Sequence, residues 1–127
     1  MRRLVVLGLL ALCVAPVAPA AEAAPAARTL SSRLQVKAYD FGFILSRPAV
    51  RAGRVTVEFL NTGEDTHNLR LKKLHSRART LGTRDVEKSD RLTRTFRLRR
   101  GTYRLFCSLP GHAKAGMRAR LQVRRAD

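Results

Sequence analysis

The sequence is poor in aromatic residues, in cysteine, in acidic residues and in long apolar runs. Its 127 residues include five Phe, two Tyr and no Trp, and these form no series on which nucleic-acid bases could stack. We therefore predict no nucleic-acid partner, although the formal net charge is +17. The one long apolar run, residues 4–14, is too short to cross a bilayer as a helix.

This apolar run has the features of a secretory signal peptide. Arg2 and Arg3 precede it, and small residues in Ala-Pro-Ala and Ala-Glu-Ala patterns follow it. We predict a signal peptide with its cleavage region at 1–26, a short linker at 27–32 and one domain at 33–127. The domain would be exported to the periplasm or the cell exterior. Lipidation at Cys13 stays open, although Leu12 stands where a lipoprotein signal would carry a small residue.

The scarcity of cysteine excludes a disulfide scaffold. Of the two cysteines, Cys13 falls in the predicted signal peptide, which leaves Cys107 alone in the domain. A single cysteine cannot form a disulfide within the domain, and an exported thiol is open to oxidation. Cys107 is therefore either buried and inert or protected by a use such as metal ligation.

The charge is strongly one-sided, with 26 Lys and Arg against 9 Asp and Glu. Two interpretations stay open. Charged strands keep sheets from pairing with one another, so the excess can be a solvated surface. A positive field would also attract an acidic protein partner or an anionic membrane surface.

Alternation of apolar and polar residues runs through most of the predicted domain. Such a period of two predicts strands with one face in the core and one in water. Turn residues such as Gly53, Gly63 and Gly101 separate these segments, whereas 73–90 is polar and unpatterned and predicts a long loop with a short helix. The pattern predicts an all-β sandwich or barrel of about seven to eight strands. The alternating segments are 33–39, 54–59, 68–72, 95–98, 103–107 and 117–124.

One short loop collects three metal-binding residue types. Cys107, His112 and Met117 follow one another at five-residue steps between two predicted strands, with Pro110-Gly111 and Gly116 suited to the bends. The first strand ends at Cys107 and the second begins at Met117, so the loop must return to the same edge of the sandwich. The three side chains can therefore converge there. A fourth ligand would come from elsewhere, and His67 opens the strand that follows a turn-rich segment.

This donor set points to copper. Thiolate and thioether favour Cu(I), imidazole tolerates Cu(II), and a trigonal His2Cys set with a weak axial Met is the blue-copper arrangement. Zinc has no use for the methionine, and iron–sulfur clusters need more cysteine. His75 is a competing ligand by residue type, but it lies in the polar stretch after the strand.

The sequence resembles the cupredoxin family, specifically small blue-copper proteins of the plastocyanin, auracyanin and rusticyanin kind. The resemblance rests on "FGF", "NTGEDTHN" and "GTYRLFCSLPGHAKAGM", which occur in the family order. It implies a cupredoxin-like Greek-key β-sandwich with His67, Cys107 and His112 as strong ligands and Met117 as the weak axial one. It also implies that Asn68 hydrogen-bonds toward the cysteine loop and stiffens it. Ala119 and Phe106 stand where relatives carry other residues, which leaves the preferred partner open.

The resemblance implies an exported type 1 copper protein that is not an enzyme. It would bind one copper ion per chain, cycle it between Cu(II) and Cu(I), and shuttle single electrons between redox partners. We expect a monomer, with a redox protein as partner, an acidic one if the charge steers association, and peripheral contact with an anionic membrane as a further option. The alternative is a copper-carrying or storage module that delivers copper to an envelope oxidase.

Overall fold

The computed structural model describes residues 30–125. The predicted signal peptide and the first half of the predicted linker, 27–29, lie outside these residues and stay predictions. The described part contains nine strands and one short helix. In chain order they are β1 (Arg33–Tyr39), β2 (Gly42–Leu45), β3 (Ala49–Arg51), β4 (Gly53–Asn61), β5 (Arg70–Lys73), β6 (Leu81–Gly82), β7 (Arg91–Leu98), β8 (Gly101–Phe106), α1 (His112–Ala115) and β9 (Arg118–Arg124).

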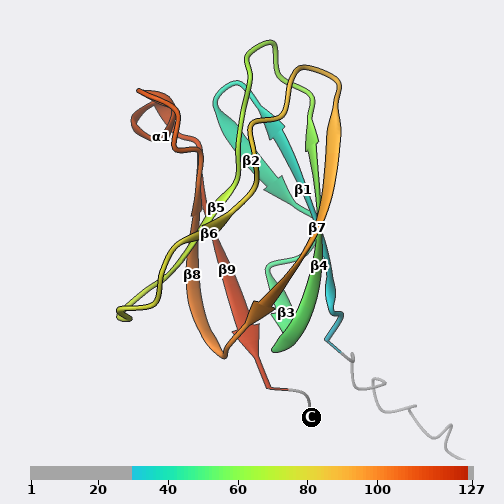
Figure 1. Cartoon of the computed structure of the whole chain (residues 1–127), viewed down its shortest axis with the longest axis vertical. Helices are drawn as coiled ribbons and strands as arrows, with labels where there is room; N and C mark the ends of the chain where they lie inside the picture. Colours follow the sequence, from blue (N-terminus) through green and yellow to red (C-terminus); the bar gives the residue numbers. More distant parts are fainter. Residues whose placement is uncertain (1–29, 126–127) are drawn as a thin grey trace, which may run out of the picture.

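The strands form two sheets that face each other as a sandwich (Figure 1). One sheet has the order β2-β1-β4-β7 and the other the order β3-β9-β8-β5-β6. The β1–β4 and β3–β9 pairs are parallel, and the remaining pairs are antiparallel. The predicted all-β class and the Greek-key sandwich are confirmed, with nine strands in place of seven to eight. No helix within residues 30–125 is long and apolar enough to cross a membrane.

The core lies between the sheets and follows the predicted alternation. Along β1, Leu34, Val36 and Ala38 are buried while their neighbours face water. Phe59 of β4 is fully buried and packs edge-on against Phe43 with 6.1 Å between ring centroids. Full burial of one such side chain is worth about 1.5–3 kcal/mol. Packing between the two inner faces therefore holds the sheets together and fixes the strand ends from which the connecting loops leave.

The predicted elements differ from the observed ones where the pattern is weak. Strands β2, β3 and β6 have four, three and two residues, too few for a period of two to be recognised. The first half of β7 carries exposed side chains on both faces, so only its end near Phe96 alternates. The stretch 73–90 contains β6 and no helix, which corrects that expectation; the one short helix of the described chain is α1, in the His112 loop.

Strand direction brings four connections to one end of the sandwich. Because β1 and β4 are parallel, the turn after Tyr39 and the loop after Asn61 leave at the same end. The antiparallel partners β7 and β5 begin there, and β8 ends there beside the start of β9. Helix α1 also lies at this end of the sandwich, which is at the top in Figure 1. Residues far apart in sequence therefore meet above the core.

Candidate metal centre

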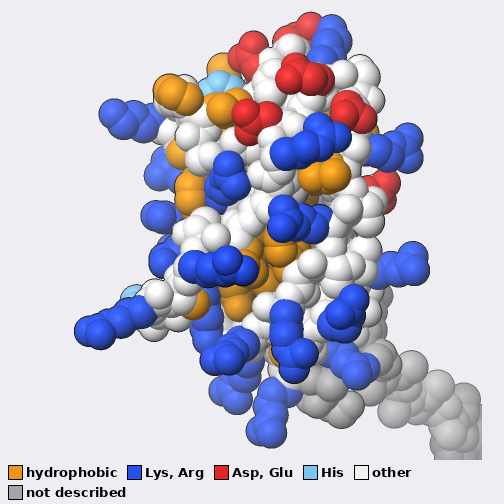
Figure 2. Space-filling model, in the orientation of Figure 1, with side chains coloured by type: hydrophobic (Ala, Val, Ile, Leu, Met, Phe, Trp, Pro, Cys, Tyr) orange, Lys and Arg blue, Asp and Glu red, His pale blue; other side chains and the backbone are white. Residues whose placement is uncertain are grey.

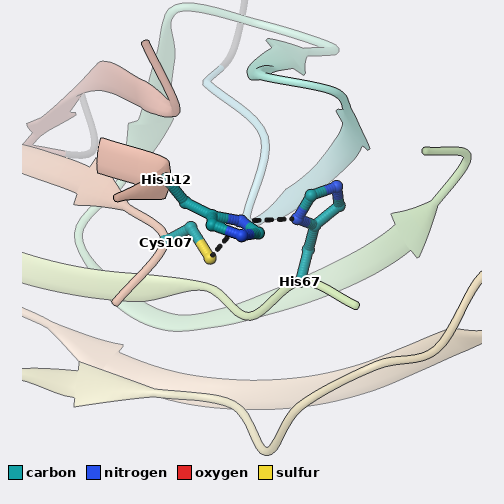
Figure 3. A group of neighbouring side chains, drawn as sticks. All are labelled: His67, Cys107 and His112. Atoms are coloured by element: carbon teal, nitrogen blue, oxygen red, sulfur yellow. Dashed lines mark hydrogen bonds between the residues drawn. The ribbon is translucent and has the colours of Figure 1, made fainter. Parts of the chain in front are cut away.

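Three of the predicted ligands converge at this end of the sandwich. His67 lies in the connection between β4 and β5, Cys107 follows β8, and His112 begins α1. Figure 3 shows the two rings and the thiol directed toward one another, and their donor atoms all lie within 4.8 Å of each other. His67 is held by backbone bonds in both directions with Val86, at 3.1 and 2.8 Å. The spacing in sequence predicted that Cys107 and His112 would meet, whereas His67 was expected there from its place after a turn-rich segment and from the family resemblance.

The four predicted ligands differ in their burial. His67, Cys107 and Met117 are fully buried, whereas His112 is partly exposed. Phe41 lies edge-on to the His112 ring, with centroids 5.4 Å apart, and is itself 42% exposed. The site is thus enclosed by protein on most sides, with the His112 edge as its contact with solvent.

The separations of the donor atoms fit one metal ion. Nδ1 of His67 lies 3.2 Å from Nδ1 of His112, and that nitrogen lies 3.7 Å from Sγ of Cys107. Metal bonds of about 2.0 Å to nitrogen and 2.3 Å to sulfur, at trigonal or tetrahedral angles, separate such donors by about 3.3–3.7 Å. The chain therefore holds two imidazoles and a thiol at the spacing of ligands to a single ion.

The loop between Cys107 and Met117 is closed by short-range backbone bonds. The Cys107 N–H donates to the Met117 carbonyl at 3.2 Å, and the Met117 N–H donates to the His112 carbonyl at 3.1 Å. Gly116 turns the chain with φ of 126°, a conformation that favours glycine, and a Cβ there would approach the Phe41 carbonyl to 3.0 Å. Met117 is thereby fixed beside Cys107, with its side chain in the core.

A carboxylate that the sequence analysis missed contacts the first histidine. Oδ1 of Asp40, in the turn after β1, lies 2.8 Å from Nε2 of His67. The Glu64 N–H donates to the other oxygen at 2.7 Å. The Glu64 N–H, and to a smaller degree the bond with His67, hold the pKa of Asp40 below its ordinary value. Asp40 is 27 residues from His67, and no local motif marks the pairing.

Comparison with known proteins agrees with this geometry. The model of the copper-binding proteins of the plastocyanin/azurin family matches residues 31–124.

The chain belongs to that family.

Solved structures share its cupredoxin fold at low sequence identity. Auracyanin from Roseiflexus castenholzii matches with a TM-score of 0.65 and 20% identity over 75% of this chain and 98% of its own. Auracyanin A, a "blue" copper protein from Chloroflexus aurantiacus, gives 0.59 and 18% over 72% and 98%. Rusticyanin from Thiobacillus ferrooxidans gives 0.58 and 21% over 74% and 79%. No curated protein matches the sequence.

Family membership identifies the cofactor of this cupredoxin as copper. The cluster of His67, Cys107 and His112, together with Met117, fits a single type 1 copper site. The predicted cofactor, one copper ion per chain, is confirmed at this level. The assignment of the four residues as its ligands remains our proposal.

Asn68 connects the two sides of the cupredoxin site. Its Oδ1 accepts hydrogen bonds from the Ser108 N–H at 2.9 Å and from the Ser108 hydroxyl at 3.1 Å. Its Nδ2 donates to Asp85 at 2.8 Å. The expected bond from Asn68 toward the cysteine loop is therefore present, and it links the residue after His67 to the residue after Cys107.

The competing histidine lies elsewhere. His75 is exposed, directly after β5, and is not part of the cluster. Since β5 begins at the metal-centre end and runs away from it, His75 belongs to the opposite part of the sandwich. Among the described residues, the histidines of the cluster are His67 and His112.

Proposed function

We propose that this cupredoxin is an exported carrier of single electrons. The observation that carries the proposal is the enclosed cluster of two imidazoles and a thiol with one partly exposed edge. When bound in such a set, copper supplies a one-electron couple between Cu(II) and Cu(I). The chain's part is to hold the donors in a fixed arrangement, so that little has to rearrange between the two states.

The protein framework supports that role by restricting the ligands. His67 is fixed through Val86 and Asp40, and Cys107 through Met117. Burial of three of the four residues excludes water and raises the barrier to ligand exchange. These features suit a site that keeps its metal while an electron passes.

The His112 edge is the proposed point of electron exchange. His112 is partly exposed, and the side chains of Phe41 and Ala113 lie next to it at the surface or half-buried. An uncharged surface over a redox ligand lets a partner approach closely without leaving charged groups desolvated. We therefore propose that a redox protein docks over this edge.

The charge of the protein is unevenly distributed, which refines the proposed partner. Figure 2 shows acidic side chains gathered at the metal-centre end and basic side chains over the rest of the visible face. Several basic residues at this end are paired, for example Lys88 with Glu64 and Arg84 with Asp90. The composition alone suggested a positive field around the whole domain. The structure shows instead that positive charge does not surround the site evenly. The acidic residues of the connections at this end are Asp40, Glu64, Asp65, Asp85, Glu87 and Asp90.

A basic face on the five-stranded sheet is our proposed contact for an acidic partner. Lys72, Arg104 and Arg120 are direct neighbours on the adjacent strands β5, β8 and β9. Like charges directly opposite each other destabilise a sheet. Charged side chains can protect an edge strand from pairing with another sheet, but β8 is an interior strand. Edge protection therefore does not explain these three basic residues. A hollow of about 260 Å³ lies where this face meets α1, between Phe106 and Lys114. Phe106 precedes Cys107 in the chain, which brings the face close to the Cys107 side chain.

Salt dependence tests the acidic partner. The rate of oxidation by ferricyanide, an anion, should fall as ionic strength rises, and Arg104→Gln should weaken that dependence. Arg54→Gln, on the opposite sheet, is the matched control. Equal slopes for wild type and both variants would contradict steering by this face. Preferential binding of the protein to anionic lipid vesicles through Arg104 would assign the face to a membrane instead.

Copper delivery is the alternative function, and redox behaviour distinguishes it. We expect a reversible one-electron wave by voltammetry, with copper retained in both states against a competing Cu(I) chelator. The fixed, buried donors favour this outcome because release needs Cys107 to become accessible. Rapid loss of Cu(I) to the chelator, with no reversible wave, would favour delivery and contradict the carrier proposal.

A further inference from the structure

We propose that Asp40 is a positioning residue of the copper site, which acts through His67 to orient its ring and to lower the reduction potential. The proposal rests on the copper site proposed above. It concerns a residue outside the ligand set, and it follows from three features of the structure: the enclosure of the His67 ring, the fixation of the carboxylate, and the space left by a glycine.

The His67 ring is fully enclosed and has one contact at each nitrogen. Its side chain is 0% exposed. Nδ1 faces the cluster, 3.2 Å from Nδ1 of His112, and Nε2 faces Oδ1 of Asp40 at 2.8 Å. A buried ring nitrogen without a partner would be costly, so the carboxylate satisfies the one polar atom of His67 that points away from the cluster.

The carboxylate is itself held in place. One oxygen accepts the Glu64 N–H at 2.7 Å, and the other lies 3.5 Å from the Asp65 nitrogen. The side chain is 27% exposed, so it is partly withdrawn from water. Backbone donors that fix an ionised carboxylate favour its charged form. Asp40 therefore presents a negative oxygen, acceptor only, to Nε2 of His67.

The chain leaves room for this pair at Gly63. A Cβ on Gly63 would collide with Oδ1 of Asp40 and would come within 2.7 Å of Nε2 of His67. The Gly63 N–H is also bonded to the Asn61 side chain at 2.9 Å, which fixes the backbone there. The close approach of Asp40 to His67 thus requires a residue without a side chain in the loop that carries His67.

A carboxylate in this position has two consequences for the ligand. It holds the proton on Nε2, which leaves the Nδ1 lone pair directed into the cluster, and it makes that lone pair more basic. A fixed negative charge one ring away also stabilises the more positive oxidation state of a bound metal. Asp40 should therefore strengthen binding of Cu(II) more than binding of Cu(I), which lowers the reduction potential.

The test compares Asp40→Asn with Asp65→Asn in the copper-loaded protein. Asparagine keeps the shape and an acceptor oxygen but removes the charge. Loss of such a partner typically weakens metal binding about 10-fold or more. We expect the ratio of Cu(II) to Cu(I) affinity to fall about tenfold in Asp40→Asn, which is a rise of ~59 mV for a one-electron couple. Asp65→Asn changes the net charge equally at the same end, without a side-chain contact to His67, and should shift the potential far less.

A second measurement examines the ring in the metal-free protein. We expect an exchange-protected Nε2–H of His67 in the proton NMR spectrum, and we expect Asp40→Ala to lose that protection. Equal potential shifts in Asp40→Asn and Asp65→Asn, or an unprotected Nε2–H in the wild type, would overturn the proposal. A wild-type protein with no reversible couple would instead contradict the proposed electron-carrier function, so the two failures are distinct.

Discussion

The metal centre joins two regions that are built in different ways. The loop region supplies Cys107, His112 and Met117 within one short segment closed by its own backbone bonds. The framework region supplies His67 and the residues that hold it. Its contacts connect distant parts of the chain, such as Asp40 with His67 over 27 residues and Asn68 with Ser108 over 40.

This difference separates two requirements of a copper site. The loop region provides three of the four proposed donors, at five-residue steps along one segment. The framework region provides orientation and exclusion of water, and these depend on how β1, β4 and β8 end together. A substitution of a ligand in the loop region should therefore change the metal chemistry directly, whereas one of a residue that holds His67 should act through the rigidity of the site or, for Asp40, through the charge beside the His67 ring.

The largest effect is expected for Cys107→Ser, in the loop region. A serine hydroxyl is not a thiolate donor, so the intense visible absorption of a blue-copper site should disappear on addition of Cu(II). The absorption spectrum is the measurement. His75→Ala, at an exposed histidine outside the cluster, is the control and should keep the colour. A blue Cys107→Ser protein would refute the assignment of Cys107.

A framework substitution, Asn68→Ala, should have an intermediate effect. It removes two hydrogen bonds to Ser108, and because Ser108 is exposed and can bond to water instead, each lost bond costs only about 0.5–1.5 kcal/mol. Thermal unfolding of the metal-free protein should shift down by roughly 4–8 °C per kcal/mol for a domain of this size. Ser108→Ala removes only the hydroxyl and should shift less. Unfolding of Asn68→Ala at the wild-type temperature would contradict the connecting role of Asn68.

The smallest effect is expected for Met117→Leu. The exchange nearly conserves volume, so stability should change by less than about 1.5 kcal/mol. Copper and colour should be retained while the reduction potential rises, because a less donating axial position favours Cu(I). Leu121→Met, at a buried position further along β9, is the control for packing. If both variants keep the wild-type potential, Met117 is a core residue and not an axial ligand.

Most of the loop region and part of the framework region could be predicted from the sequence. The steps between Cys107, His112 and Met117 lie within one segment, and period-two burial marked β1, β4 and β9. Asp40 could not be predicted, because its pairing with His67 depends on the parallel register of β1 and β4. The same holds for β3, which is only three residues long and gains its place by pairing with β9.

The distribution of charge was also beyond prediction. Composition gives a net charge, but the position of Glu64 or Asp90 at the metal-centre end follows from where the connections gather. The basic row across β5, β8 and β9 likewise depends on the register that aligns Lys72 with Arg104 and Arg104 with Arg120.

Titration of the metal-free domain with Cu(II), followed by its visible spectrum, tests the central claim most directly. If His67, Cys107 and His112 hold one copper with Met117 as a weak axial ligand, an intense blue absorption should grow and stop at one equivalent. Binding without that absorption, or colour that keeps increasing well past one equivalent, would contradict a single type 1 copper site in this chain.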